Sequence, residues 1–523
     1  MKYPKKVKKY KKIFYSRVVT SGLFILLQIA WLFFIYFTFL FGVEYVNLGV
    51  RILAVFFLIY IVNKKTEKIE YKTSWIILIL LFPMFGVPFY FFYGDKKPGR
   101  RFLKRLRNTS DLYKKYRKID SKLLDEMAEE SPSTVLTSGY IVNDGGFPLH
   151  KNTEVTYYEQ GEKLYASMLE SLKKAEKFIF MEYFTIERAN LWDEILEILV
   201  EKAKAGVKVR LLYDDVGCAV YLPKNYMNQL NELDPNIECM KFNRIVPVFS
   251  MMMNNRDHRK MMIIDGDVGF TGGINLSDRY INIDSPYGHW KDAGVRLRGD
   301  AVWNMTLIYL EMWDAISKKE DLTEEEVRNY MPSDYGVPKY PDGGFVQPYA
   351  DQPFDDIPMS ENVYLSMIST SKEKIYIYTP YLILSDELSN ALCLSAMQGK
   401  DVRIVVPGIP DKKMVYRLTR SSYPVLLRAG VKVYEYTPGF IHSKCMMIDG
   451  KCASVGTVNF DYRSLFLHFE DSVYFSENQA VKELEKDMLR TFDKCKEIKI
   501  EDTHKTAVGI AVDSALRLIA PIL

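Results

Sequence analysis

A residue pattern that occurs twice constrains the fold of this chain more than any other feature. The pattern is His-x-Lys-x4-Asp, followed ten residues beyond the Asp by Asn. Its two copies contain His258, Lys260, Asp265, Gly272 and Asn275 in the first half of the chain and His442, Lys444, Asp449, Gly456 and Asn459 in the second. In a chain with six histidines, one chance match to His-x-Lys-x4-Asp is expected about 0.03 times. Two copies therefore indicate a duplicated unit rather than coincidence.

The sequence before each copy repeats the same order of predicted elements, which is helix, strand, helix, strand. In the first half these elements are Gly161–Lys174, Phe178–Tyr183, Leu191–Ala205 and Val207–Tyr213, and in the second half Met359–Ser371, Ile375–Tyr381, Asp386–Gln398 and Val402–Val406. The segment GVKVRLLYD at 206–214 corresponds to GKDVRIVVP at 399–407. We therefore predict an α/β fold with an internal duplication of roughly 200 residues.

The motif residues suit chemistry on a phosphodiester. In a strand, His and Lys two positions apart lie on the same face, where both can meet one phosphate. The phosphodiester is anionic, so Lys260 and Lys444 would supply positive charge to its non-bridging oxygens, and Asn275 and Asn459 neutral donors. One histidine would attack phosphorus, while the other would protonate the departing alkoxide and then deprotonate the incoming hydroxyl.

Neither a metal nor a cofactor is predicted. The six cysteines are scattered without a CxxC pair, and the lysine beside each motif histidine would repel a zinc ion. The sequence contains no Gly-rich phosphate loop, so a nucleotide has no visible cradle. The remaining histidines, which are His150, His289, His468 and His504, are expected to be structural.

The amino-terminal region is predicted to be a membrane anchor. Residues 1–118 carry a net charge of +19, which leaves −15 for the rest of the chain. Within 1–107 there are two or three hydrophobic segments, at 18–43, 45–62 and 75–93. The third is broken by two prolines and a glycine, so we expect it to re-enter the membrane rather than cross it. That topology places every basic segment, and the catalytic domain, on the cytoplasmic face.

Composition sets the other expected boundaries. The segment Lys319–Asp356 is acidic and rich in Pro and Gly, as an interdomain linker would be. The expected parts after the anchor are a connector at 108–150, a first domain at 151–335, a second domain at 336–500 and an amphipathic helix at 501–523. Two interpretations of this last helix stay open, a membrane contact and a packed final helix.

The two motifs are the signature of the phospholipase D superfamily, and the wider sequence resembles cardiolipin synthases in particular. The resemblance rests on NNRDHRKMMIIDGDVGFTGGIN at 254–275, FIHSKCMMIDGKCASVGTVN at 440–459, WIILILLFPMFGVPFYFFYG at 75–94 and RLIAPIL at 517–523. It implies two phospholipase D-like α-β-α domains related by pseudo-twofold symmetry, whose motifs form one active site. The apolar segment 18–43 is an addition to the family pattern.

The same resemblance implies roles for individual residues. His258 would be the nucleophile and His442 the acid and base, with Asp292 or Glu470 holding an imidazole in the correct tautomer. Asp265 and Asp449 belong to the catalytic motif, although we expect them chiefly to tie its strands. The implied reaction transfers a phosphatidyl group between two phosphatidylglycerol molecules at the bacterial cell membrane.

The segment just before the first motif is unusually apolar. It reads IVPVFSMMM at 245–253 and includes Phe249, Met251, Met252 and Met253. Met and Phe side chains adapt to acyl chains, so we predict a lipid-facing lip beside the catalytic site. A buried strand is the alternative.

Three other functions stay open, which are a hydrolytic phospholipase D, a nuclease and a membrane scaffold without catalysis. A nuclease would carry positive charge on its catalytic body, where this chain has −15, so no nucleic acid partner is predicted. Two complete motifs disfavour the scaffold. Anionic membrane lipids are the expected partners of the basic amino-terminal end.

Overall fold

The computed structural model describes residues 26, 29–34, 36–37, 44–64, 68–83, 86–87, 89–90, 94, 100–243, 254–317, 322–332, 334–355 and 357–520. The chain forms two compact units. The first contains Met1–Gly99, Asn243–Asn255 and Lys505–Leu523, and the second contains Arg100–Phe242 and Arg256–His504. The predicted lip residues Phe249, Met251, Met252 and Met253 lie outside the described residues.

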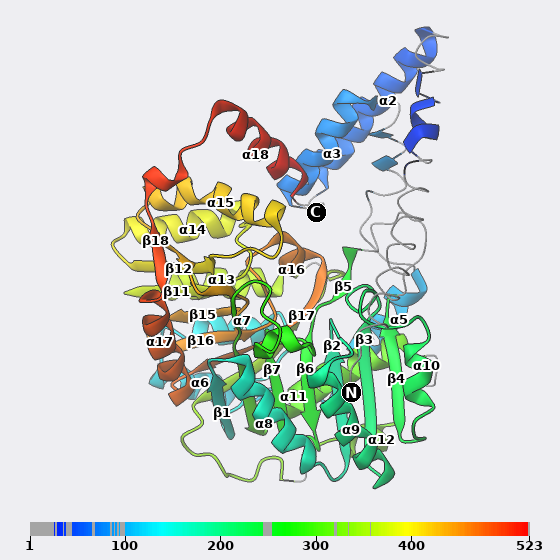
Figure 1. The fold of residues 1–523 in the computed structure, drawn as a ribbon, viewed down its shortest axis with the longest axis vertical. Helices are drawn as coiled ribbons and strands as arrows, with labels where there is room; N and C mark the ends of the chain where they lie inside the picture. The colour runs from blue at the N-terminus through cyan, green and yellow to red at the C-terminus, as the bar shows by residue number, and fades with distance from the viewer. Residues whose placement is uncertain are drawn as a thin grey trace. The chain divides into compact units, whose positions relative to one another are not determined.

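The first half of the second unit is built on a seven-stranded sheet (Figure 1). In spatial order its strands are β1 (Thr153–Tyr158), β9 (Gly294–Gly299), β7 (Val268–Gly272), β6 (Lys260–Ile264), β2 (Phe178–Tyr183), β3 (Lys208–Asp214) and β4 (Ile237–Phe242). The strands β2, β3 and β4 are parallel, and the other neighbours are antiparallel. Lys260 of the first motif is the first residue of β6, the central strand of this sheet.

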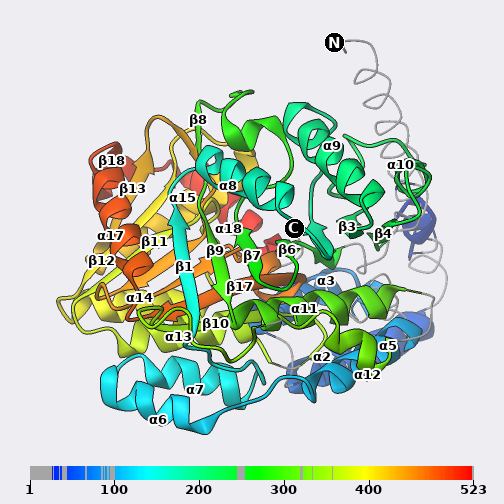
Figure 2. The ribbon, with the colours of Figure 1, turned by 90° about the horizontal axis from the view of Figure 1, so that it is seen from below.

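The second half repeats this order strand for strand. Its path is β10 (Phe345–Asp351), β17 (His468–Ser476), β16 (Cys452–Gly456), β15 (Cys445–Ile448), β11 (Lys374–Tyr378), β12 (Asp401–Pro407), β13 (Lys432–Tyr436) and β18 (Cys495–Ile498). Only β18 has no counterpart in the first path. The predicted duplication and the α/β class are therefore confirmed, and Figures 1 and 2 show the two halves side by side.

Helices cover both sheets. The first half contains α8 (Gly161–Lys173), α9 (Asn190–Lys204), α10 (Tyr226–Asn231), α11 (Ala301–Ile316) and α12 (Glu324–Arg328), and the second α13 (Met359–Thr370), α14 (Asp386–Met397), α15 (Lys413–Arg428), α16 (Tyr462–Phe466) and α17 (Gln479–Phe492). Every helix and strand predicted before the motifs is present within a residue or so at its ends, with one exception. The strand predicted to reach Tyr381 stops at Tyr378, because Pro380 has no amide hydrogen for a ladder.

The connector is helical and belongs to the second unit. It consists of α5 (Arg100–Lys114), α6 (Ser121–Glu130) and α7 (Val135–Asn143). The helix α5 starts inside the range 1–107 that we expected to be anchor, and it packs on α11 with Leu106 and Tyr113 in the core. The Tyr113 hydroxyl donates to Asp314 Oδ2 at 2.5 Å. Burial of this apolar face, with a satisfied hydroxyl, fixes α5 to the domain.

The first unit contains α2 (Glu44–Asn63), α3 (Ile69–Leu81) and α18 (Ala507–Ile519). A small core joins α2 and α3 through Ile61, Tyr71 and Trp75. The helix α18 lies within the predicted range 501–523 and packs on α3, where the Ser74 hydroxyl donates to the Leu518 carbonyl. No described helix has both the length and the apolar character needed to cross a membrane. The spans at 18–43, 45–62 and 75–93 therefore stay predictions.

Candidate active site

Two short strand pairings tie each motif to the opposite half. The strand β5 (Arg256–Asp257) pairs with β17, and β14 (Gly439–Ile441) pairs with β8 (His289–Lys291). The His258 amide donates to the Phe469 carbonyl at 2.9 Å, and the His442 amide donates to the Lys291 carbonyl at 2.7 Å. In both cases the acceptor immediately precedes an acidic residue, so each motif histidine reaches an acid of the other half.

The two predicted orienting acids are used in this crossed manner. His258 Nδ1 lies 2.9 Å from both Oε1 and Oε2 of Glu470, and His442 Nδ1 lies 2.7 Å from Asp292 Oδ2. Both carboxylates are fully buried. A carboxylate on Nδ1 holds the proton there and leaves the Nε2 lone pair for chemistry. Since each half supplies the histidine of one pair and the acid of the other, the two motifs form one site.

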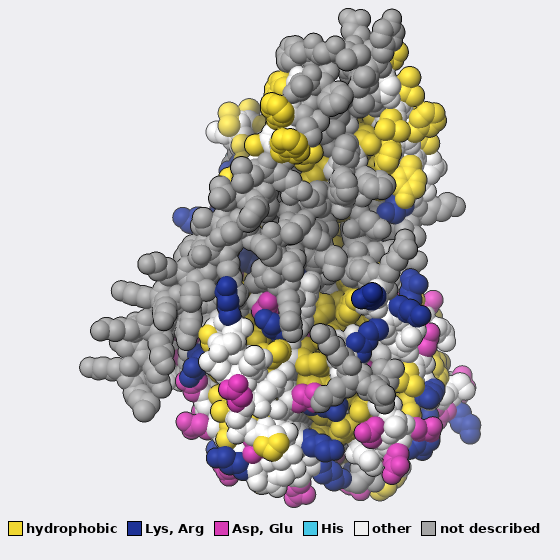
Figure 3. All heavy atoms as spheres, turned by 90° about the vertical axis from the view of Figure 1, so that its right-hand side faces the viewer, with side chains coloured by type: hydrophobic (Ala, Val, Ile, Leu, Met, Phe, Trp, Pro, Cys, Tyr) yellow, Lys and Arg dark blue, Asp and Glu magenta, His cyan; other side chains and the backbone are white. Residues whose placement is uncertain are grey.

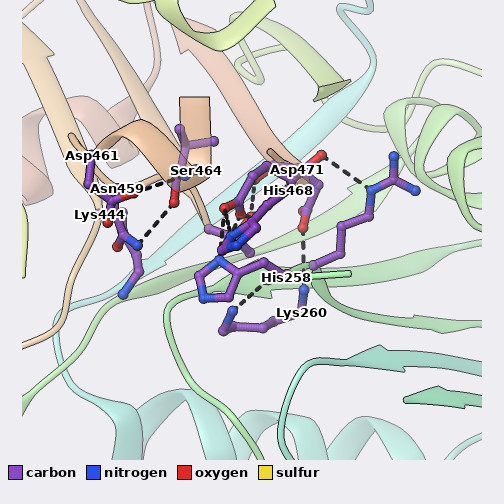
Figure 4. Close-up of polar contacts among 12 residues, drawn as sticks. His258, Lys260, Lys444, Asn459, Asp461, Ser464, His468 and Asp471 are labelled. Atoms are coloured by element: carbon purple, nitrogen blue, oxygen red, sulfur yellow. Dashed lines mark hydrogen bonds and ion pairs between the residues drawn. The ribbon is translucent and has the colours of Figure 1, made fainter. Parts of the chain in front are cut away.

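The motif lysines are almost completely buried beside the histidines. Lys260 Nζ donates to the His258 carbonyl at 2.5 Å, and Lys444 Nζ donates to the His442 carbonyl and lies 2.9 Å from His442 Nδ1. Burial lowers the pKa of Lys260 to about 8 and that of Lys444 to about 7, and nearby carboxylates oppose the shift. Lys260 therefore keeps its charge below about pH 8, and Lys444 keeps its charge below about pH 7. Figure 4 shows both lysines, one from each half, around His258.

Both motif imidazoles are neutral in the free enzyme. Burial, followed by the charges of Lys260 and Lys444, lowers the pKa of His258 well below its ordinary value. Burial and Lys444 lower the pKa of His442 to about 3. Burial disfavours the charge on Asp292, but His442 and Lys444 outweigh it and lower the pKa of this carboxyl. The site therefore holds two neutral rings among fixed charges, as attack on an anion requires.

Each motif asparagine already donates one hydrogen bond to another side chain of the protein. Asn275 Nδ2 donates to the Tyr280 hydroxyl at 2.7 Å, and Asn459 Nδ2 donates to Ser464 Oγ at 3.0 Å. An amide nitrogen carries two hydrogens, so one remains on each for a phosphate oxygen. The two asparagines thus keep the predicted capacity to donate.

The motif aspartates do not face the histidines. Asp265 accepts hydrogen bonds from the backbone amides of Glu176, Lys177 and Phe178, and Asp449 accepts from those of Lys372, Glu373 and Lys374. Both aspartates have positive φ, of 54° and 55°, at a turn that leaves the motif strand. These contacts tie the motif strand to its neighbour, and a structural part for both aspartates stays our prediction.

His468, which we expected to be structural, lies beside His258 in the site. Its ring centroid lies 5.4 Å from that of His258, and its Nδ1 lies 3.6 Å from Glu470 Oε1 (Figure 4). Burial lowers its pKa to about 3, so the ring is neutral. A signal was available, because His468 precedes Glu470 by two positions in a strand and must share its face.

Sequence reasoning did not identify a buried network of ionisable side chains behind His258. Arg259 Nε donates to the Glu470 carbonyl at 3.2 Å, and its Nη1 lies 3.6 Å from Glu182 Oε1. Glu182 is fully buried, and burial and then Asp257 raise its pKa well above the usual value. This network lies beside a cavity of about 420 Å³ that Arg259 and Phe469 help to line. The hydrogen bond from Arg259 to the Glu470 carbonyl fixes the backbone at Glu470.

The donor set does not favour a metal. Among the described residues, only His258, His468 and Glu470 bring three suitable ligand atoms within 4.8 Å of one another. The Thr457 hydroxyl and His258 already use the oxygens of Glu470. Lys260 and Lys444 add positive charge beside them, which disfavours a cation and favours an anionic phosphate.

A duplicated α/β unit in which each half gives a His and a Lys to one site defines a protein of the phospholipase D class. Two family models match the chain. The model described as "Cardiolipin synthase, PLD-like domain" matches residues 168–285 and again 364–492, and "Phospholipase_D-nuclease N-terminal" matches 52–94.

Individual relatives agree with these matches. An uncharacterized protein of Streptococcus mutans is 38% identical, covering 89% of this chain and 99% of its own length. A cardiolipin synthase of a Geobacillus species is 33% identical, covering 90% and 92%. The chain therefore belongs to the cardiolipin synthase family. The crystal structure of phosphatidylserine synthase from Haemophilus influenzae, at 16% identity and a TM-score of 0.56, covers 75% of this chain and 100% of its own and shares the fold.

Proposed function

We propose that this chain is a cardiolipin synthase that transfers the phosphatidyl group of one phosphatidylglycerol to a hydroxyl of another and releases glycerol. The observation that carries the proposal is the pair of crossed contacts, His258 with Glu470 and His442 with Asp292, beside two buried lysines. Such a site suits double displacement on a phosphodiester. Relatives that bear the name cardiolipin synthase, 31–34% identical over most of the chain, support cardiolipin as the product.

In the first step, His258 Nε2 forms a bond to phosphorus and the bond from phosphorus to the glycerol oxygen breaks. His442 gives its Nε2 proton to that oxygen, so glycerol leaves neutral. His442 must carry this proton in the substrate complex, and the charges of the phosphodiester and of Asp292 favour it there. Lys260 and Lys444 stabilise the charge on the non-bridging oxygens as it is redistributed.

In the second step, the hydroxyl of another phosphatidylglycerol attacks phosphorus. His442 takes the hydroxyl proton, the bond from phosphorus to Nε2 breaks, and its electron pair returns to His258. The products are cardiolipin and the free enzyme, with no cofactor in the balance. Water in place of the alcohol would give phosphatidic acid, which is the hydrolytic phospholipase D alternative.

The amino-terminal region would hold the enzyme at the cell membrane. Residues 18–43, 45–62 and 75–93 are the candidate segments, and the family match at 52–94 covers the second and third. The net charge of +19 on residues 1–118 favours contact with anionic lipid headgroups and a cytoplasmic catalytic domain. Phe249 and Met251 to Met253 would form the lip over which acyl chains enter.

The described surface gives no support to the nuclease alternative. On the face drawn in Figure 3, Lys and Arg side chains intermingle with Asp and Glu over the lower part of the molecule. Residues 119–523 carry a net charge of −15. Nucleic acid binding depends on clustered positive charge that displaces counterions, whereas the described charges on this face are of mixed sign.

The direct test supplies the purified full-length protein with phosphatidylglycerol vesicles and identifies the products by mass spectrometry. We expect cardiolipin and glycerol in equal amounts. Phosphatidic acid as the main product would replace the synthase with a hydrolase. A His258→Ala, His442→Ala double variant is the matched control and should give neither product.

A further inference from the structure

One difference between the two halves lies at the position two residues before each orienting acid. His468 precedes Glu470 by two residues in the second half, and Trp290 precedes Asp292 by two residues in the first. Their ring centroids lie at similar distances from the motif histidines, 5.4 Å between His468 and His258 and 5.2 Å between Trp290 and His442. The duplicated fold thus places an imidazole beside one motif histidine and an indole beside the other.

His468 is buried with unused polar atoms. Only 8% of the residue is exposed, and neither ring nitrogen has a hydrogen-bond partner within the described part of the chain. An unsatisfied buried polar group costs about 1–3 kcal/mol, so packing alone does not account for an imidazole at this position. Its Nδ1 is directed to Glu470 Oε1, at 3.6 Å. A small adjustment of the ring would close this gap to a hydrogen bond.

Glu470 is therefore the point at which two imidazoles meet. Its Oε2 accepts from the Thr457 hydroxyl, and its two oxygens lie 2.9 Å from His258 Nδ1. A further donor on Oε1 draws negative charge away from His258. A weaker hydrogen bond between Glu470 and Nδ1–H makes the His258 imidazole a weaker base. The imidazole is then a better leaving group when its bond to phosphorus breaks in the second step.

We propose that His468 is a positioning residue that shares Glu470 with His258 through its Nδ1 hydrogen and thereby speeds the breakdown of the phosphohistidine. In this step the acceptor oxygen bonds to phosphorus, the bond from phosphorus to His258 Nε2 breaks with its electrons on nitrogen, and the acceptor proton passes to His442. His468 touches none of the reacting atoms. The inference rests on the proposed function because it requires the phosphohistidine at His258. It does not depend on whether the acceptor is an alcohol or water.

The test compares His468→Phe with His468→Asn in the full-length protein. Asn places an amide N–H near the position of Nδ1, whereas Phe fills the space without a donor. With a nitrophenyl phosphatidyl ester as donor, the rate of the nitrophenol burst reports formation of the intermediate, and rapid quench reports the phosphorylated fraction. We expect His468→Phe to lower turnover about tenfold, to raise the phosphorylated fraction and to leave the burst rate within about twofold. We expect His468→Asn to restore turnover.

Trp290→Phe is the matched control, because it changes the equivalent position of the other half and should leave the phosphorylated fraction unchanged. Thermal unfolding of every variant separates loss of fold from loss of rate. Equal losses in His468→Phe and His468→Asn, or an unchanged phosphorylated fraction in His468→Phe, would overturn the inference. Failure of the wild type to form any adduct would instead contradict the proposed function, and the inference with it.

Discussion

The two motif histidines have the same place in the two halves but different neighbours at Nδ1. His258 Nδ1 faces both oxygens of Glu470, at 2.9 Å each. His442 Nδ1 lies between Asp292 Oδ2 at 2.7 Å and Lys444 Nζ at 2.9 Å. A ring held only by a carboxylate keeps its proton on Nδ1 and its lone pair on Nε2, which suits a nucleophile. Burial and the ammonium of Lys444 lower the pKa of His442, so this ring readily gives its Nε2 proton to a leaving alkoxide.

The halves also show which features the fold needs twice. Asp265 and Asp449 accept the same three kinds of amide hydrogen bond, and both motif histidines donate their amide to a carbonyl across the halves. The groups beside the two imidazoles, by contrast, differ between the halves, with Glu470 and His468 at His258 and Asp292 and Trp290 at His442. The two halves thus share a symmetrical frame, and the acids and His468 make the surroundings of the two rings unequal.

The largest predicted effect concerns the crossed acids. Glu470→Gln and Asp292→Asn should each lower turnover by about 10²–10⁴-fold, because an amide leaves the imidazole in the wrong tautomer. The effects should differ by step when nitrophenol release is measured. Glu470→Gln should slow the burst, whereas Asp292→Asn should keep the burst and slow the following turnover. A slowed burst in Asp292→Asn alone would exchange the roles of the two halves.

The next effect is the pH dependence that the lysines impose. Lys260 and Lys444, with pKa values of about 8 and about 7, keep their charge below these values and lose it as the pH rises through them. Because positive charge stabilises the transition state, kcat/KM should fall above about pH 7, by up to tenfold per pH unit. In Lys444→Arg the remaining activity should decline only at higher pH, since guanidinium stays charged. An identical alkaline limb in that variant would contradict the assignment.

A smaller and symmetrical effect is expected at the motif aspartates. Asp265→Asn and Asp449→Asn each weaken a carboxylate that holds three backbone amides, so each should lower the free energy of unfolding by about 1–3 kcal/mol in urea denaturation. Turnover below the unfolding transition should stay within a few fold of the wild type. A loss of activity in the folded protein, like that of a His258 variant, would return these residues to the chemistry.

The smallest effect is expected from metal removal. The group of His258, His468 and Glu470 lies in only one of the two histidine environments, and the lysines already provide positive charge. Dialysis against EDTA should therefore leave cardiolipin formation unchanged. If activity is lost and a divalent ion restores it, a metal bound by these three residues would be part of the site.

Much of the fold could be predicted because its signals are local. Runs such as Phe178–Tyr183 are fully buried strands, and the motif repeats mark the duplication. The end of β11 was misjudged because Pro380 interrupts an apolar run. Residues 1–107 were assigned as one anchor, although α5 begins at Arg100, because basic charge continues across that boundary.

The site was predicted less completely because its contacts are distant in sequence. Both acids were identified, but their crossing depends on how the halves pack, with 212 residues between His258 and Glu470 and 150 between Asp292 and His442. His468 was expected to be structural because it lies outside both motifs. His468 lies in the site because it is buried and shares a strand face with Glu470. Neither property can be predicted from one residue considered alone.

The central claim is that the two rings do unequal work, with His258 bonding to phosphorus and His442 moving protons. The most direct measurement is rapid-quench trapping of the phosphorylated protein in His442→Ala, with a nitrophenyl phosphatidyl ester whose leaving group needs no proton. We predict an acid-labile, base-stable adduct that peptide mass spectrometry locates on His258, and no adduct in His258→Ala. An adduct on His442 in His258→Ala would reverse the assignment, and no adduct in either variant would contradict covalent transfer.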